Sequence, residues 1–490
     1  MNRWWRKAAW LLCFSCIGLN AQAQDVIYSG YEKYDMRSGD FNVIGKVGGR
    51  LYTYRSTGDG FFMDIWTDSM NREATVILDF FPNKIYETKF VAYPDKVIVL
   101  YQGLERGKVI QYAAKMDEMG RLVGDPVKID SVKTGFFGPN KDYFSSVVSD
   151  DKRNIVVYGV NPKGAVLNIG ATILDDNLSK VGRFHSEFEG EGRMSAGTGM
   201  VSNNGVFYLP VYSIAGSDDN AARIWLLSRK AGETSYSRTE LPLDEKYATS
   251  TFMRVDNNAN RIYAGGFYSE KKSGNYDGII YAQYDISAQS FTTRKLIPFD
   301  DTLKAATGAR SAKRAFNNYQ TRQLIVKNDG GFVLISEAYY QSVRNTGPGY
   351  GYGYGFYPMY GSPFMASRNI REYHYDDILA LSYNGDGVRE WHAFVRKDQY
   401  SQEDGGVFSS YALLNTGGSL GFLYNNFNGR RSEIQLATID AGGQVKMRSM
   451  SPSGNDSPDW LPRAGKQVSS KELIIPCLRK KQICFAKIIF

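Results

Sequence analysis

The sequence predicts an all-β fold made of many short strands, arranged as a ring of small antiparallel sheets. A polar turn followed by an apolar run rich in β-branched and aromatic residues recurs eight times, from "VGGRLYTY" to "SSKELIIPC". A second apolar run follows each copy, and more polar strand-like runs fill the space between copies. Four short strands per unit, with units about 50 residues apart, are the pattern of a β-propeller blade.

The repeat can be followed along the whole chain. Its eight copies lie at 47–54, 93–101, 150–159, 202–211, 257–266, 328–337, 416–425 and 469–477. Six of the second runs end on a residue whose side chain starts turns, namely Asp68, Asp117, Asp175, Asp285, Asn384 and Asp440. A glycine follows three residues later at Gly120, Gly387 and Gly443, where positive φ costs glycine little.

The apolar runs also indicate where each strand lies in its sheet. Runs such as "VIVLY", "IVVYG" and "FVLIS" do not alternate with polar residues, so we expect middle strands covered on both faces by neighbouring blades. An outer-membrane barrel, the alternative, needs alternating strands of about ten residues with a lipid-facing apolar row. The shorter, continuously apolar runs favour the propeller.

The two ends of the chain predict how the ring closes. The chain ends after the third strand of the eighth copy, and "DVIYSGYEKYDM" at 25–36 is a strand-like run before the first copy. We therefore predict eight four-stranded blades, or seven if one copy is misread, with the N-terminal strand completing the last blade. That pairing would hide the strand edges of both ends.

Some runs resemble those of known propeller families. "GGRLYTY" and "NRIYAGG" resemble kelch strands, and "SYNGDGVREW" resembles the turn of quinoprotein-type and outer-membrane-assembly propellers, through Asn384, Gly387 and Trp391. The resemblance covers the architecture of the mature chain and assigns no single family. The tryptophan pattern occurs in one copy only, which argues against a quinone, and we predict no cofactor.

The N-terminus is typical of a secretory signal peptide, expected at residues 1–23. Arg3, Arg6 and Lys7 precede an apolar run of twelve residues and the small-x-small site Ala21-Gln22-Ala23. A lipoprotein signal ending at Cys16 is the alternative. We expect residues 24–490 to form a single exported domain without a transmembrane helix, in the periplasm, at the outer membrane or on the surface of a Gram-negative cell.

Two cysteines remain after the predicted cleavage. Cys477 and Cys484 flank the polar stretch Arg479-Lys480-Lys481-Gln482, which reads as a hairpin turn. In such a hairpin the two cysteines lie directly opposite each other, close enough for a disulfide. We predict that bridge; two reduced, buried cysteines are the alternative.

A Gly/Tyr-rich segment is the strongest binding signal. Gly347–Phe364 holds no charge, and it lies within a predicted loop insertion at about 341–372. Long loops are uncommon unless functional or disordered, and tyrosine rings suit stacking on sugars or peptides. The loop is interpreted as contacting a partner, as covering the mouth of the ring, or as disordered. The predicted binding residues, with two from a neighbouring basic loop, are Tyr350, Tyr352, Tyr354, Phe356, Tyr357, Tyr360, Arg310 and Arg314.

No catalytic motif stands out. The histidines His185, His374 and His392 have no metal-ligand spacing, so we predict no metal site. Acidic doublets at 218–219, 300–301 and 376–377 suit turns, or else glycosidase carboxylates or calcium ligands. The formal net charge of +8 is mild for 490 residues and does not favour nucleic-acid binding.

The sequence therefore predicts an exported, non-enzymatic propeller that acts as a binding or scaffolding module. Its expected partner is a protein of the cell envelope or a glycan, and one version is an accessory subunit of an outer-membrane or periplasmic complex. The alternative is a glycan-active hydrolase or lyase, or a glycan-binding protein, that uses the loop-rich face of the ring.

Overall fold

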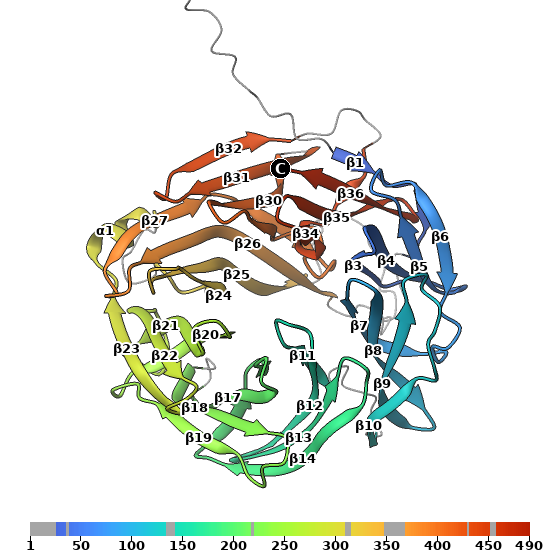
Figure 1. Ribbon diagram of the computed structural model, residues 1–490. Coiled ribbons are helices and arrows are strands. Elements are labelled where there is room, and N and C mark those ends of the chain that lie inside the picture. The colour runs from blue at the N-terminus through green and yellow to red at the C-terminus, as the bar shows by residue number, and fades with distance from the viewer. Residues whose placement is uncertain are drawn as a thin grey trace, which may run out of the picture.

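The computed structural model describes residues 26–35, 39–133, 143–216, 220–308, 315–346, 368–428, 431–450 and 457–490. Its antiparallel sheets stand side by side in a closed ring, with chain order running around the circle (Figure 1). The predicted β-propeller is confirmed.

Three four-stranded sheets open the ring. The first holds β3 (Phe41–Val47), β4 (Arg50–Thr57), β5 (Gly60–Trp66) and β6 (Arg72–Ile77). The second holds β7 (Ile85–Ala92), β8 (Lys96–Glu105), β9 (Lys108–Asp117) and β10 (Val127–Lys133). The third holds β11 (Ser145–Val148), β12 (Asn154–Lys163), β13 (Val166–Asp175) and β14 (Lys180–Glu189).

A nine-stranded sheet follows and consists of two halves. The first half holds β15 (Arg193–Ala196), β16 (Met200–Val201), β17 (Val206–Ala215), β18 (Asn220–Lys230) and β19 (Ser237–Leu241). The second half holds β20 (Tyr247–Asp256), β21 (Arg261–Ser269), β22 (Gly278–Asp285) and β23 (Ser290–Pro298). The single pair Ala221↔Ala248 joins them. Whether this sheet counts as one blade or two decides between seven and eight, so the number eight stays a prediction.

Two sheets lie between this one and the closing sheet. One holds β24 (Tyr319–Val326), β25 (Phe332–Thr346), β26 (Arg368–Tyr383) and β27 (Arg389–Val395), with β28 (Gln399–Gln402) also paired to β26. The other holds β29 (Tyr411–Asn415), β30 (Ser419–Asn428), β31 (Arg431–Asp440) and β32 (Val445–Ser449).

The closing sheet joins both ends of the chain. Its C-terminal strands are β33 (Asp459–Trp460), β34 (Lys466–Ser469), β35 (Glu472–Arg479) and β36 (Gln482–Ile489). Its N-terminal strands, β1 (Val26–Tyr28) and β2 (Glu32–Lys33), both pair with β36. Val26 lies opposite Ile488, so the N-terminal strand completes the last sheet as predicted.

The two cysteines of this sheet lie directly opposite each other, in the pair Cys477↔Cys484. The hairpin register that the sequence predicts is therefore confirmed. Both side chains are buried free thiols, so the predicted disulfide is not formed in this structure.

Recurring Asp and Asn turns fix the outer hairpins as the sequence predicts. Asp117 accepts hydrogen bonds from the backbone N–H groups of Met119 and Arg121, at 2.8 and 2.9 Å. Gly120 within that turn has a φ of +77°, a region that suits glycine. Asp440 and Gly443 repeat the arrangement between β31 and β32.

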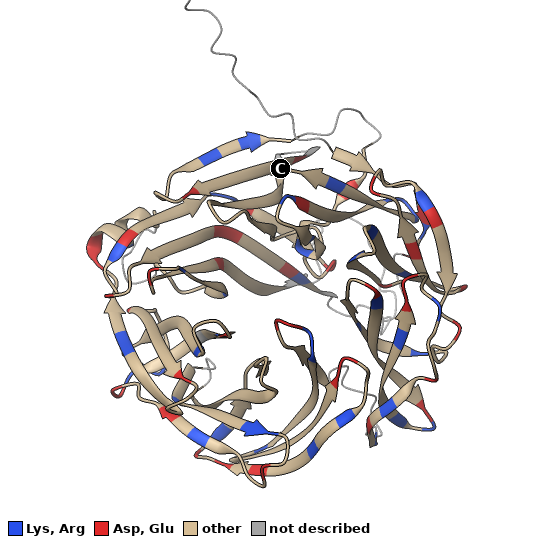
Figure 2. Cartoon of the chain, viewed as in Figure 1, with Lys and Arg blue, Asp and Glu red and all other residues tan. Residues whose placement is uncertain are grey.

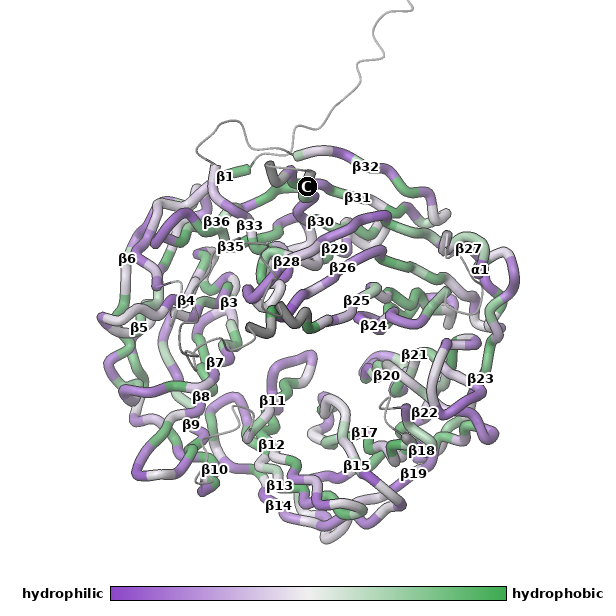
Figure 3. Tube along the Cα trace, turned by 180° about the vertical axis from the view of Figure 1, so that it is seen from behind, coloured by the Kyte–Doolittle hydropathy of each residue, from purple (hydrophilic) through white to green (hydrophobic). Residues whose placement is uncertain are grey.

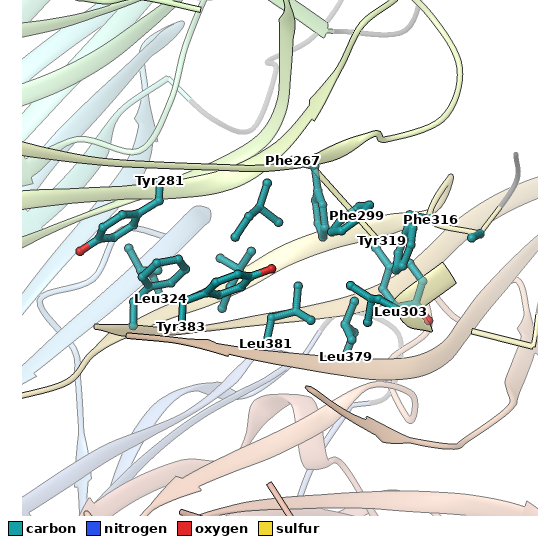
Figure 4. Packing of buried hydrophobic residues seen from close by; sticks show 14 of the residues in the cluster. Phe267, Tyr281, Phe299, Leu303, Phe316, Tyr319, Leu324, Leu379, Leu381 and Tyr383 are labelled. Carbon is teal, nitrogen blue, oxygen red and sulfur yellow. The ribbon is translucent and has the colours of Figure 1, made fainter. Parts of the chain in front are cut away.

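The hydrophobic core lies between neighbouring sheets. One cluster packs Phe267 and Tyr281 of one sheet against Leu324, Leu381 and Tyr383 of the next (Figure 4). Middle strands such as β8 are buried along most of their length, as the continuous apolar runs predict. The outermost strand β32 is mostly exposed and largely hydrophilic or pale in Figure 3.

Two connections contain regular structure. Residues 213–215 end β17 and residues 220–222 begin β18. The crossover at 300–317 contains a short helix, α1 (Asp301–Ala306), which the sequence did not indicate. Asp300 caps that helix by accepting from the N–H of Leu303, and Leu303 is buried in the core cluster. The closing sheet also contains the 3₁₀ turn η2 (Pro462–Ala464).

In the ranges that the structure describes, no helix is long and apolar enough to cross a membrane.

Candidate functional site

The predicted binding residues are not placed by the structure. Tyr350, Tyr352, Tyr354, Phe356, Tyr357, Tyr360, Arg310 and Arg314 all lie outside the described residues. The strands that lead into the Gly/Tyr-rich segment are described, and they are longer than expected. Residues 341–346 and 368–372, predicted as loop, belong to β25 and β26.

These two strands project beyond the rest of their sheet. β24 pairs with β25 only as far as Tyr319↔Ala338, whereas β25 and β26 stay paired out to Thr346↔Arg368. β28 adds a third strand beside β26, from Tyr375↔Gln399 to Glu372↔Gln402. We call residues 339–346, 368–375 and 399–402 the β25–β26 extension. Figure 1 shows it running toward the middle of the ring.

One face of the extension presents a row of three rings. Tyr340, His374 and Tyr400 lie opposite one another on the three strands. The rings of Tyr340 and His374 are stacked with centroids 4.2 Å apart, and the ring of Tyr400 is tilted against His374 at 5.0 Å. Tyr340 is 37% exposed and Tyr400 is 44% exposed, so part of each ring surface is accessible.

A carboxylate is fixed beside this ring row, two residues further along the strands. Glu372 accepts hydrogen bonds from the hydroxyls of Ser342 and Tyr400, both at 2.8 Å. The Gln402 amide in turn donates to the Tyr400 hydroxyl. Because side chains alternate along a strand, these groups share the face of the rings.

The opposite face of the extension lines a cavity of about 420 Å³. Tyr339 and Tyr375 pack there with ring centroids 4.5 Å apart. The guanidinium of Arg322 lies over the Tyr339 ring at 5.6 Å, and that of Arg463 lies over the Tyr375 ring at 5.9 Å. All four residues line the cavity, with Ser410 and Tyr411.

A buried ion pair supports this cavity. The Lys397 Nζ lies 2.9 Å from a Glu337 carboxylate oxygen, and the two side chains are 1% and 0% exposed. Lys397 also donates to the Tyr375 carbonyl and the Gln399 side chain, both at 2.9 Å. The Lys397 ammonium therefore makes two hydrogen bonds in addition to its ion pair with Glu337.

Glu337 links that ion pair to the cavity wall. It accepts from the Ser410 hydroxyl at 2.8 Å and from the Arg322 Nε at 3.2 Å. Burial lowers the pKa of Lys397, and the neighbouring Glu337 acts against that shift. Burial also raises the pKa of Tyr375 to about 12, so its hydroxyl, which accepts from Arg463 at 2.7 Å, stays protonated.

The acidic residues of the doublets differ in their partners. Asp300 caps α1 and pairs with Arg389 at 2.7 Å, and Asp377 binds Arg396 and the N–H of Lys397. Asp300 thus marks the start of a helix, whereas Asp376 and Asp377 lie within β26, so the turn expected at that doublet is wrong. Asp376 differs, because burial and then the nearby Asp398 raise the pKa of its carboxyl. The doublet at 218–219 lies outside the described residues.

The histidines play separate parts. His374 belongs to the ring row, whereas His392 sits near Phe394 with its pKa lowered by burial. Within the described ranges no group of His, Cys, Asp and Glu side chains could hold a metal ion.

Two further cavities lie elsewhere on the ring. The larger, about 690 Å³, is lined by small and hydroxyl side chains of the third sheet and the nine-stranded sheet, including Ser195, Thr198, Tyr212 and Thr251. The smaller, about 360 Å³, lies near Trp391 and Leu420. The smaller cavity combines the half-buried Trp391 ring with the Lys327–Glu390 ion pair.

Sequence reasoning missed most of this site. The sequence patterns do not single out Arg322, Glu337, Glu372, Lys397, Tyr400 or Arg463. They include His374 only as a histidine and Asp376 only as part of an acidic doublet. One signal was available: Glu337 directly follows "FVLIS", and Lys397 comes two residues after "HAFV", both of which form strands. Charges of opposite sign in such positions suggest a pair.

No protein-family model matches the sequence, and no curated protein does. Three solved structures illustrate the likeness in fold. Prolyl oligopeptidase B from Galerina marginata, without ligand, is 11% identical with a TM-score of 0.41, covering 91% of this chain and 56% of its own. The dihydro-heme d1 dehydrogenase NirN in complex with DHE is 10% identical with a TM-score of 0.42, covering 92% and 71%.

An ulvan lyase, from a family of polysaccharide lyases, is 10% identical with a TM-score of 0.39, covering 81% of this chain and 90% of its own. The chain spans a little over half the length of the prolyl oligopeptidases that it matches. Similarity of this degree assigns the chain to no family.

Proposed function

We propose that the protein is an exported, non-enzymatic binding module of the Gram-negative cell envelope that holds a glycan on the β25–β26 extension. The observation that supports this most is the ring row of Tyr340, His374 and Tyr400 with Glu372 fixed beside it. The extension stands on a rigid propeller, and binding groups commonly gather on projecting segments of such scaffolds.

The chemistry of the ring row suits a sugar. Tyrosine rings give flat apolar surface with a polar tip, and they lose little conformational entropy on binding. Glu372 accepts hydrogen bonds from sugar hydroxyls, and the Gln402 amide both donates and accepts. A sugar ring also offers one apolar face and a rim of hydroxyls, which matches rings flanked by hydrogen-bonding groups.

The fixed position of Glu372 adds to the argument. A carboxylate on an exposed strand needs no protein partner, because water solvates it well. Here two hydroxyls, from Ser342 and Tyr400, hold it in one place. Such preorganisation lowers the entropic cost of binding a ligand.

The predicted binding residues fit the same proposal. Tyr350, Tyr352, Tyr354, Phe356, Tyr357 and Tyr360 lie in the segment that joins Thr346 of β25 to Arg368 of β26. They are aromatic, as Tyr340 and Tyr400 are, and rings of this kind suit the same class of ligand.

The proposal is tested by measuring binding of neutral and acidic oligosaccharides to the wild type and to variants Y340A and Y400A. Loss of one stacking ring should weaken binding by about tenfold or more. Y31A is the matched control, because Tyr31 is 36% exposed but lies beside Arg479 on the closing sheet. Variants that bind as tightly as the wild type would refute the role of the ring row.

A protein of the cell envelope is the other partner that the sequence favours. Deletion of residues 347–364, followed by affinity purification from native membranes, distinguishes a protein partner from a glycan. A protein captured by the wild type but not by the deletion, with no oligosaccharide bound by either, would replace the glycan proposal.

One observation favours a glycan-active enzyme as second candidate. Asp376 is a partly buried carboxyl whose raised pKa suits a general acid, and Asp398 supplies a second carboxylate nearby. If this holds, D376N removes polysaccharide turnover and leaves oligosaccharide binding intact. If the wild type turns over none of the polysaccharides that it binds, the enzyme candidate is refuted and the binding module is the remaining function.

A further inference from the structure

We infer that the glycan is acidic, and that the cavity between Arg322 and Arg463 takes one of its oxyanion groups, a carboxylate or a sulfate ester. This inference rests on the proposed function and names the ligand class more narrowly.

The cavity is built as a layered set of four planar groups. The order is Arg322, Tyr339, Tyr375 and Arg463, with separations of 5.6, 4.5 and 5.9 Å between successive groups. Cation–π contact and one polar partner hold each guanidinium in place, namely Glu337 for Arg322 and the Tyr375 hydroxyl for Arg463. Both arginines line the same cavity of about 420 Å³.

The charge balance of the cavity is positive. Lys397 and Glu337 compensate each other in the buried ion pair. Arg322 contacts a single oxygen of Glu337, and Arg463 contacts the neutral hydroxyl of Tyr375. Each guanidinium has five N–H donors, so both retain donors beyond these contacts. Two arginines with spare donors suit an oxyanion, which guanidinium binds with two parallel hydrogen bonds.

The inner wall of the ring reinforces this preference. The strands on the inner edge of the sheets, which border the central axis of a propeller, hold six basic residues, Lys46, Lys89, Arg193, Arg254, Arg322 and Lys466, against three acidic ones, Glu87, Asp256 and Asp459. Figure 2 shows the charged residues of the chain, with Lys and Arg in blue and Asp and Glu in red, and both colours are mixed on the outer strands.

Two of these lysines are held without a carboxylate. The Lys89 amine donates to the Ser146 carbonyl at 2.5 Å, and the Lys466 amine donates to the Ile44 carbonyl at 3.0 Å. Among the ion pairs between described residues, none includes Lys89 or Lys466. Uncompensated positive charge inside a ring raises the local concentration of anionic ligands.

A single glycan chain can reach both faces of the extension. The ring row and the cavity lie on opposite faces of the same three strands, since Tyr339 and Tyr340 are adjacent in β25. Beyond Ala338, no described strand pairs with the outer edge of β25. A flexible oligosaccharide can pass around that edge, stacking one sugar on the ring row and placing a charged one in the cavity.

The test measures binding of oligogalacturonides, sulfated galactan oligosaccharides and neutral galacto-oligosaccharides of equal length. We expect the wild type to bind one or both acidic series about tenfold or more tightly than the neutral one. In R463Q this preference should fall to about threefold or less, with neutral binding unchanged. R463K should lie between them, because lysine keeps the charge and lacks the planar fork.

R479Q is the matched control. Arg479 also lies over a tyrosine ring, that of Tyr31 at 5.5 Å, but in the closing sheet. Its removal should leave the preference for acidic oligosaccharides intact, and an equal loss in R479Q and R463Q would overturn the inference as an effect of general charge.

The outcomes separate the inference from the proposed function. If the wild type binds neutral and acidic oligosaccharides equally, and Y340A still weakens both, the acidic preference is refuted while glycan binding stands. If no oligosaccharide binds, thermal unfolding in sodium sulfate and sodium chloride at equal ionic strength tests the cavity alone. If sulfate stabilises the wild type more than chloride does, and R463Q lacks this difference, the cavity is an oxyanion site even though no glycan binds. If sulfate stabilises the wild type and R463Q equally, both the oxyanion site and the glycan proposal are refuted.

Discussion

Lys46 in the first sheet and Glu472 in the closing sheet form an ion pair with a nitrogen–oxygen distance of 2.8 Å. Lys487 of β36 reaches the same carboxylate at 2.8 Å and Asp68 at 2.7 Å, and its side chain is only 2% exposed. The network thus joins the beginning of the ring to its end, next to the pairing of β1 with β36.

This network makes the closure sensitive to acid. Burial by itself raises the pKa of Glu472, but hydrogen bonds from Lys46 and Lys487 outweigh it and lower that pKa to about 2, from an ordinary 4.5. A carboxyl whose pKa is depressed on folding stabilises the fold above its unfolded pKa, and this is lost as the pH falls from about 4.5 toward 2.

We therefore expect E472Q to be less stable than the wild type at pH 7 and to lose less stability between pH 5 and pH 2.5, as measured by urea unfolding. E73Q is the control, since Glu73 pairs with Arg50 at 2.8 Å on the surface, where ion pairs contribute little. Parallel pH profiles of the wild type and E472Q would contradict the role of the network.

Gly443 should be essential for contact between two sheets. A Cβ at this position would lie 2.7 Å from the Trp391 ring, and the Trp391 indole donates to the Ala441 carbonyl of the same turn at 3.0 Å. We expect G443A to lower the free energy of unfolding by about 2 kcal/mol more than G417A. Gly417 has nearly the same φ, +82° against +81°, but nothing within 4 Å of the added Cβ. If denaturant unfolding shows equal losses of unfolding free energy in G443A and G417A, backbone strain alone explains them and the contact with Trp391 does not contribute.

The two buried cysteines give a prediction about reactivity. Burial raises the pKa of the Cys477 thiol well above its usual value, which suppresses the reactive thiolate. We expect no alkylation of the native protein by iodoacetamide and alkylation of both cysteines after unfolding without reductant, read by mass spectrometry. Alkylation of the native protein would contradict the burial. Protein that reacts in denaturant only after reduction would instead contain the bridge that the sequence predicts.

The buried Lys397–Glu337 pair gives a prediction about stability. K397M leaves the Glu337 carboxylate buried with only Arg322 and Ser410, so we expect a loss of about 3 kcal/mol in urea unfolding. The double variant K397M/E337M removes both charges and should lose less than K397M alone. A greater loss in the double variant would mean that the pair itself, rather than the uncompensated charge, determines the stability.

The architecture was accessible to sequence reasoning because it repeats. One strand pattern recurs around the ring, and turns such as Asp117–Gly120 give the same local signal each time. The pairing of β1 with β36 was predictable because the last repeat lacks a fourth strand and a strand-like run precedes the first repeat. The helix α1 escaped because six residues are too few to show a helical period.

The site was accessible only in part because it depends on contacts between distant residues. Arg322, Tyr339, Tyr375 and Arg463 meet across about 140 positions of sequence, and no local spacing relates them. The ring row follows from the register of β25, β26 and β28, which a single residue shift would destroy. Sequence reasoning located the aromatic segment beside this site but not the strands that form it.

The most direct test of glycan binding on the extension is the proton NMR signal of the His374 imidazole. The chain has three histidines, so His185 and His392 serve as internal controls in the same spectrum. Because His374 lies between Tyr340 and Tyr400, a sugar on the ring row changes the ring currents at its imidazole protons. On separate addition of oligogalacturonides and galacto-oligosaccharides, we expect the His374 signal to shift with at least one series while the other two stay in place. A His374 signal that does not move with either, or three signals that move together, would contradict the account.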